Sequence, residues 1–146
     1  MCIRDRGYAY SREDVDARSL ANLYAQYLGQ VFTHEMKPLE VEILVAELGT
    51  ELHPNQLYHI AYEGTITDED RYAVLGGETE AIAQEVESGW VENWSLSAAL
   101  QATVGALAGA ERTLVGKDLE AAVLTEGSGR RSFHRLMDDE LDALLT

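Results

Sequence analysis

The chain has 146 residues, of which 26 are acidic and 11 are basic, so its formal net charge is -15. This excess of carboxylates repels phosphate backbones and anionic lipid surfaces, so we expect neither nucleic acid nor membranes as partners. With 46% hydrophobic and 25% charged residues, the composition is typical of a folded protein. The single cysteine, Cys2, excludes a disulfide framework and a thiolate zinc site, and it is compatible with a reducing cytoplasm.

The first predicted element is a helix of about six turns. Ser11 is its expected N-cap, because a hydroxyl there can accept a hydrogen bond from a first-turn amide. Pro38 marks its limit, since the residue before a proline is pushed out of the helical region. Apolar residues recur between these points at spacings of three and four. They predict a buried stripe of Ala17, Leu20, Ala21, Tyr24, Leu28, Val31 and Phe32.

Four strands are predicted next, over residues 39–46, 56–62, 65–67 and 72–75. The first alternates glutamates with apolar residues and then becomes apolar on both faces, so it should enter the sheet from solvent. The others are short, rich in aromatic and β-branched residues, and separated by turn residues. Because no helix intervenes, consecutive strands of this kind predict an antiparallel sheet.

The second half of the chain is predicted to begin with two helices. The first covers residues 79–87, and the second starts behind a Ser95 N-cap and ends at Gly109. The inward residues of the first helix are expected to be Ala81, Ile82 and Val86. The apolar stripe of the second is expected to be Leu96, Leu100, Val104 and Leu107.

A hairpin and a short helix complete the predicted fold. Residues 119–125 and 131–136 read as strands joined by a glycine-rich loop at 126–129. Asp138 is the expected cap of the last helix, which should bury Leu141, Leu144 and Leu145. The order of one helix, four strands, two helices, two strands and one helix predicts an α+β protein with antiparallel sheets.

The four histidines do not form an obvious site. His53 and His59 are six residues apart, but Pro54 places a turn between them, and no cysteine or carboxylate stands at a zinc-like spacing. His34 lies at a helix C-terminus, where the helix dipole stabilises an imidazolium. His134 lies on a predicted strand, so its side chain should point to the opposite face from those of its two sequence neighbours. We weigh a metal site against surface or interface histidines and favour the second interpretation.

Two further motifs allow a functional and a structural interpretation. Glu40 and Glu42 share a strand face, and paired carboxylates can divide acid and base roles. Glutamates at a strand entry also keep a sheet soluble, which we favour. Gly76 and Gly77 precede a helix and are similar to a phosphate-binding turn. Glu78 would repel a phosphate there, so we favour a tight strand-to-helix turn.

Cys2 is the remaining candidate nucleophile. An N-terminal nucleophile uses its own amine as the base and needs a strand behind it. Cys2 is followed instead by Arg4, Asp5 and Arg6. We therefore assign it no chemistry, and the residues predict no catalytic, cofactor-binding or metal-binding position and no cofactor.

Several segments resemble a known family in the same order along the chain. They include residues 7–10 (GYAY), 20–26 (LANLYAQ), 37–42 (KPLEVE), 45–47 (VAE), 57–64 (LYHIAYEG), 74–80 (VLGGETE), Ser95-Leu96 and the segment 119–145. From Gly7 onward the chain closely resembles the actinobacterial 20S proteasome α-subunits. No single segment is diagnostic alone, but their common order makes the resemblance specific.

The resemblance implies part of the four-layer αββα sandwich of N-terminal-nucleophile hydrolases, with two antiparallel sheets between helix layers. We expect residues 1–146 to be a single, incomplete α-subunit domain in which residues 1–6 are a start foreign to the family and Met1 is not the true start. Family members carry a preceding portion with the gate, the first strands and the lysine that receives the activator tail. None of those residues can be assigned here.

The resemblance also implies a function. The expected role is a non-catalytic α-subunit of the cytoplasmic 20S proteasome core, in an outer ring of seven copies that gates substrate entry for protein degradation. The implied partners are other α-subunits, β-subunits, a ring ATPase activator and unfolded protein substrates. Two alternatives remain open, namely a catalytic β-type threonine protease or related amidohydrolase, and an acidic protein-interaction module.

Overall fold

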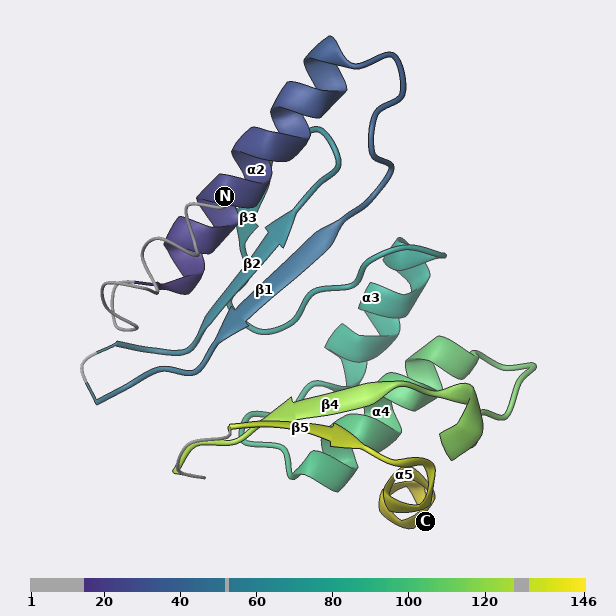
Figure 1. Ribbon diagram of the computed structural model, residues 1–146. Coiled ribbons are helices and arrows are strands. Elements are labelled where there is room, and N and C mark those ends of the chain that lie inside the picture. The colour runs from purple at the N-terminus through teal and green to yellow at the C-terminus, as the bar shows by residue number, and fades with distance from the viewer. Residues whose placement is uncertain (1–14, 52, 128–131) are drawn as a thin grey trace. The chain divides into compact units, whose positions relative to one another are not determined.

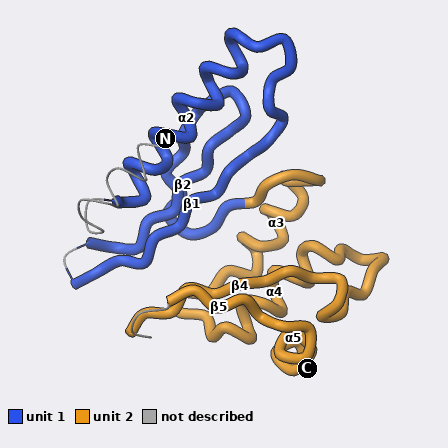
Figure 2. The backbone as a smooth tube through the Cα atoms, viewed as in Figure 1, with its two compact units in different colours: residues 1–73 blue, residues 74–146 orange. Residues whose placement is uncertain are grey.

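The computed structural model describes residues 15–51, 53–127 and 132–146 (Figure 1). The chain divides into two compact units, residues 1–73 (unit 1) and residues 74–146 (unit 2), which Figure 2 colours separately. Each unit combines helices with antiparallel strands. The predicted α+β class with antiparallel sheets is therefore confirmed.

Helix α2 spans Ala17–His34 and begins later than predicted. Its N-cap is Asp16, whose Oδ1 accepts a hydrogen bond from the Ser19 backbone N–H at 2.6 Å. Glu47 of the sheet accepts another, from the N–H of the first helical residue, at 2.7 Å. The predicted cap, Ser11, lies outside the described residues. Serine and aspartate are about equally good N-caps, so cap preference alone does not select between Ser11 and Asp16. The hydrogen bond to Glu47 of the sheet helps to decide where α2 starts.

One face of α2 packs against the sheet of unit 1. The predicted stripe is largely correct, but it missed Ala25, which is buried, and it included Phe32, which is exposed. Alanines spaced four residues apart lie on one side of a helix, and their small side chains let the sheet approach closely. The buried core of unit 1 consists of Ala17, Ala21, Ala25, Leu28, Val45, Tyr58 and Ile60.

The sheet of unit 1 has three strands in the order β1-β2-β3, all antiparallel. The strands are β1 (Ile43–Glu47), β2 (Gln56–Ile60) and β3 (Ile66–Asp68). The central strand pairs Ile60 with Ile43 on one side and with Ile66 on the other. These pairs stack β-branched side chains on the face that α2 covers.

Two strand predictions were wrong. The predicted first strand started at residue 39, but β1 starts at Ile43, because its partner β2 ends at Ile60, directly opposite. Residues 72–75 form no strand in the described ladders, which hold three strands in this sheet and two in the other. A β-rich composition produces a strand only where a neighbouring backbone continues the ladder.

Unit 2 begins with helices α3 (Thr79–Gly89) and α4 (Leu96–Ala108). The Ser95 cap of α4 is confirmed, since its Oγ accepts a hydrogen bond from the Ala98 N–H at 3.2 Å. Gly109 follows α4 as predicted, with φ at +61°. Burial is narrower than predicted, because only Val86 of α3 and Val104 of α4 are buried, whereas the following predicted inward residues are exposed: Ala81, Leu96 and Leu107.

The end of the chain forms a short 3-10 helix, η1 (Gly116–Asp118), which was not predicted, and then a strand pair and a helix. Strands β4 (Ala121–Leu124) and β5 (Phe133–Leu136) pair antiparallel, as predicted, with Ala121 opposite Leu136. Residues 128–131 of the intervening loop lie outside the described residues.

Helix α5 spans Asp138–Leu145, so Asp138 is its first residue and not its cap. The cap position belongs to Met137, whose N–H donates to Glu140 Oε2 at 2.8 Å. A glutamate in the first turn thus satisfies an amide that the predicted aspartate cap would have left to water. Leu141 is fully buried as predicted, whereas Leu144 and Leu145 are half-buried.

The described helices were also compared with what a bilayer requires. Within residues 15–51, 53–127 and 132–146, none combines the length and the apolar character needed to cross a membrane.

Candidate functional site

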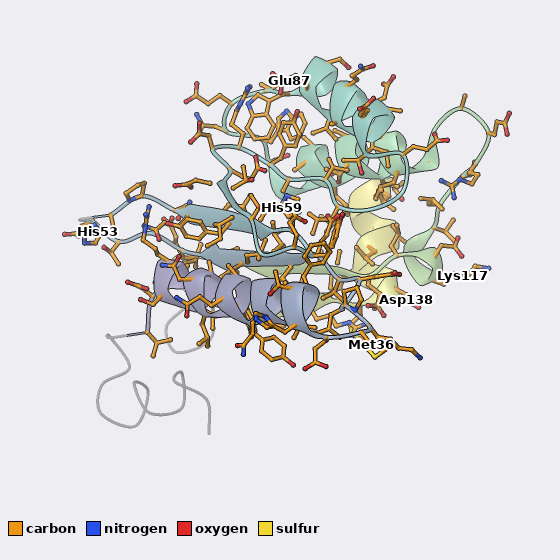
Figure 3. All side chains as sticks on the ribbon, turned by 90° about the horizontal axis from the view of Figure 1, so that it is seen from above. Met36, His53, His59, Glu87, Lys117 and Asp138 are labelled. Atoms are coloured by element: carbon orange, nitrogen blue, oxygen red, sulfur yellow. The ribbon has the colours of Figure 1, made fainter. Side chains whose placement is uncertain are left out.

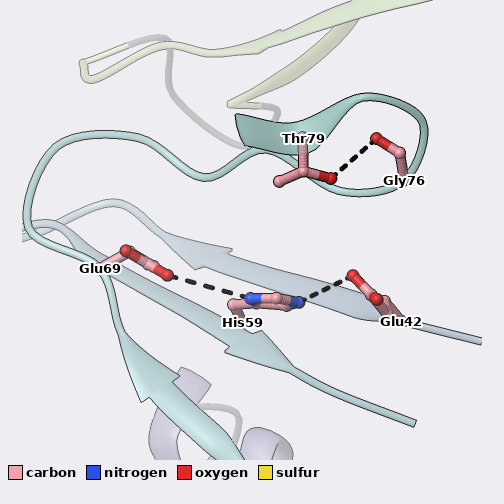
Figure 4. A network of polar contacts seen from close by, with 5 residues as sticks. All are labelled: Glu42, His59, Glu69, Gly76 and Thr79. Atoms are coloured by element: carbon pink, nitrogen blue, oxygen red, sulfur yellow. Dashed lines mark hydrogen bonds and ion pairs between the residues drawn. The ribbon is translucent and has the colours of Figure 1, made fainter. Parts of the chain in front are cut away.

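A polar cluster in unit 1 surrounds His59 (Figure 4). His59 lies on β2, opposite Leu44 of β1 and Thr67 of β3. Its Nε2 lies 3.0 Å from Glu42 Oε2, and its Nδ1 lies 3.9 Å from Glu69 Oε1. The histidine side chain is only 22% exposed. It therefore connects the residue just before β1 to the residue just after β3, across the width of the sheet.

The geometry of this cluster is that of a cross-link. The two glutamates approach different ring nitrogens, which point away from one another, so the three side chains do not surround a common point. Metal ligands converge on one position at about 2 Å. Among the described residues, no group of three or more His, Cys, Asp or Glu is placed to hold a metal ion.

The other three histidines lie in separate surroundings. His34, the last residue of α2, contacts the hydroxyl of the preceding threonine at 2.7 Å. His53 exchanges two backbone hydrogen bonds with Thr50, of 2.8 and 3.2 Å, in a narrow turn. His134 Nε2 lies 3.3 Å from Glu140 Oε1. Figure 3 shows His53 and His59 at separate points of unit 1, as the proline between them predicted.

The prediction that Glu40 and Glu42 share a strand face is wrong. Both precede β1, which starts at Ile43. Both residues are exposed, and Glu42 contacts His59. The histidine partner could not be found from sequence because it comes from the neighbouring strand. Cys2 lies outside the described residues.

The Gly76-Gly77 turn has the backbone geometry that requires glycine. The φ angles of the two residues are +73° and +65°. The Thr79 hydroxyl donates to the Gly76 carbonyl at 3.0 Å, closing the turn at the start of α3 (Figure 4). The N-cap position is occupied by Glu78, whose side chain makes no capping hydrogen bond. The turn at the start of α3 is therefore supported, but the strand predicted before it, residues 72–75, does not form in the described ladders.

A groove of about 860 Å³ opens beside this turn, within unit 2. Its walls are the start of α3 and the end of α4. The sequence could not indicate it, because the two walls are separated along the chain by most of both helices. The lining includes Leu75, Ile82, Glu78, Glu85, Leu107 and Arg112.

Two carboxylates at helix starts have altered acidity. Hydrogen bonds from the Ser19 side chain and backbone hold the pKa of Asp16 below its ordinary value. A hydrogen bond from the Met137 N–H, with a smaller effect of His134, likewise lowers the pKa of Glu140. Both carboxyl groups accept hydrogen bonds at the start of a helix, so these structural contacts explain their lowered pKa values, which do not indicate a catalytic site. The sequence signals differ, since Asp16 is the N-cap of α2 and Glu140 lies in the first turn of α5.

Comparison with known proteins gives a consistent result. A protein-family profile described as "Proteasome subunit" matches residues 5–124. A protein of Acidimicrobium ferrooxidans named "Proteasome subunit alpha" is 54% identical over 136 residues, which cover 93% of this chain and 59% of the relative. Proteins with the same name from Arthrobacter sp. and Mycobacterium tuberculosis are 44% and 46% identical over 97% and 96% of this chain.

The relatives are longer than this chain. The matched regions cover 63% of the Arthrobacter protein and 60% of the Mycobacterium tuberculosis protein. The chain thus spans about three fifths of the length of the curated relatives that it matches.

Proposed function

The chain belongs to the proteasome subunit family, and on this premise we propose that it is a non-catalytic α-subunit of the 20S proteasome core. The observation that supports this proposal is the similarity to proteins named proteasome subunit alpha, which reaches 54% identity and extends over more than nine tenths of the chain. The alternatives of a catalytic β-type subunit and of a generic acidic module have no comparable support.

The proposed role is structural and gating. Seven copies would form an outer ring that stacks on β-subunit rings in the cytoplasm, receives a ring ATPase activator, and limits the entry of unfolded proteins. The proposed fold is the four-layer αββα sandwich. Each unit supplies helices and antiparallel strands, which is the content that such a sandwich requires.

The decisive experiment is native mass spectrometry of the full-length gene product, alone and co-expressed with its β-subunit. We expect a heptameric α-ring and, with the β-subunit, a stacked particle. A protein that stays monomeric and ignores the β-subunit would contradict the proposal.

Catalysis is tested separately with a fluorogenic peptide. The α-subunit alone should give no turnover, and the particle should lose turnover when the β-subunit nucleophile is replaced. Turnover by the α-subunit alone, abolished by a single substitution in it, would favour the enzyme alternative.

A further inference from the structure

We draw no further inference here: the strongest candidate, the groove of about 860 Å³ in unit 2 between the start of α3 and the end of α4, is lined by apolar side chains and by the exposed carboxylates Glu78, Glu85 and Glu111, and nothing in the structure shows what covers it.

Discussion

The two units use apolar residues very differently. Of the eleven buried apolar residues in the described chain, seven belong to unit 1 and four to unit 2. Those of unit 1 form one contiguous cluster between α2 and the sheet. Those of unit 2, which are Val86, Val104, Leu136 and Leu141, come from four different elements.

The difference shows that hydrophobic composition alone does not bury a helix. Helix α4 is richer in apolar residues than α2, yet it buries only Val104. Helix α2 has a sheet along one side and small residues that permit close approach. The burial of a helix therefore depends on the element that packs against it. The substitutions below compare the two units by hydrogen exchange, which reports the stability of each unit separately.

The largest effect is expected for Leu28→Ala in unit 1. Leu28 is 2% exposed within the contiguous core, so the substitution leaves a cavity and should lower the opening free energy of β2 by about 2–5 kcal/mol. The neighbouring Tyr27→Ala, at a residue that is 56% exposed, is the control and should change it by less than about 0.5 kcal/mol. Equal effects of the two substitutions would mean that the packed face of α2 is misassigned.

Glycines with positive φ offer the next comparison. An added Cβ at Gly64 (φ +92°) would lie 2.5 Å from the Ala25 carbonyl, so Gly64→Ala must push α2 from the sheet. We expect a loss of about 2–4 kcal/mol in unit 1, measured by hydrogen exchange of α2. At Gly76 (φ +73°) nothing lies within 4 Å, so Gly76→Ala should cost only the backbone strain, about 1–2 kcal/mol, in unit 2. The reverse order would contradict the close helix–sheet contact.

Leu141→Ala measures the core of unit 2. Leu141 is fully buried, but the neighbouring Leu144 and Leu145 are only half-buried and can shift into the space. We expect a loss of about 2–3 kcal/mol, the lower part of the range for such truncations. Val91→Ala, at an exposed site of the same unit, is the control. A loss larger than that of Leu28→Ala would invert the comparison between the units.

The helix caps should show a pH dependence. Asp16→Ala should cost about 1 kcal/mol at pH 7, because it removes the cap of α2. Folding lowers the Asp16 pKa, so the charged group stabilises unit 1 above its unfolded pKa near 3.9, and the stabilisation is lost as the pH falls through the lower folded value. Melting at pH 7 and pH 3 should therefore show a smaller effect of Asp16→Ala in acid. A constant difference would contradict the lowered pKa.

The smallest effects concern the histidine pairs. His59 and Glu42 are 22% and 38% exposed, whereas His134 and Glu140 are 57% and 43% exposed. Double-mutant cycles should give a coupling of up to about 1 kcal/mol for the first pair and a few tenths for the second, because solvent screens exposed charges. A stronger coupling in the second pair would show that His59 does not cross-link the sheet.

The sequence predicted the structure correctly where a local pattern of residues is compatible with only one local conformation. The Ser95 cap and the glycine after α4 were correctly predicted, as were the strand pair around Ala121 and Leu136 and the burial of Leu141. The resemblance to proteasome α-subunits was likewise readable, because many short segments occur in a common order. These features depend on neighbours in sequence, which a single chain displays directly.

Tertiary structure decided the rest. The start of α2 at Ala17 depends on Glu47, the start of β1 depends on where β2 ends, and the Glu42–His59–Glu69 cluster joins three strand ends. Most apolar residues of α4 are only partly buried, although α3 and α5 pack against this helix. Each outcome depends on which distant segment lies opposite, and periodicity or composition carries no information about that choice.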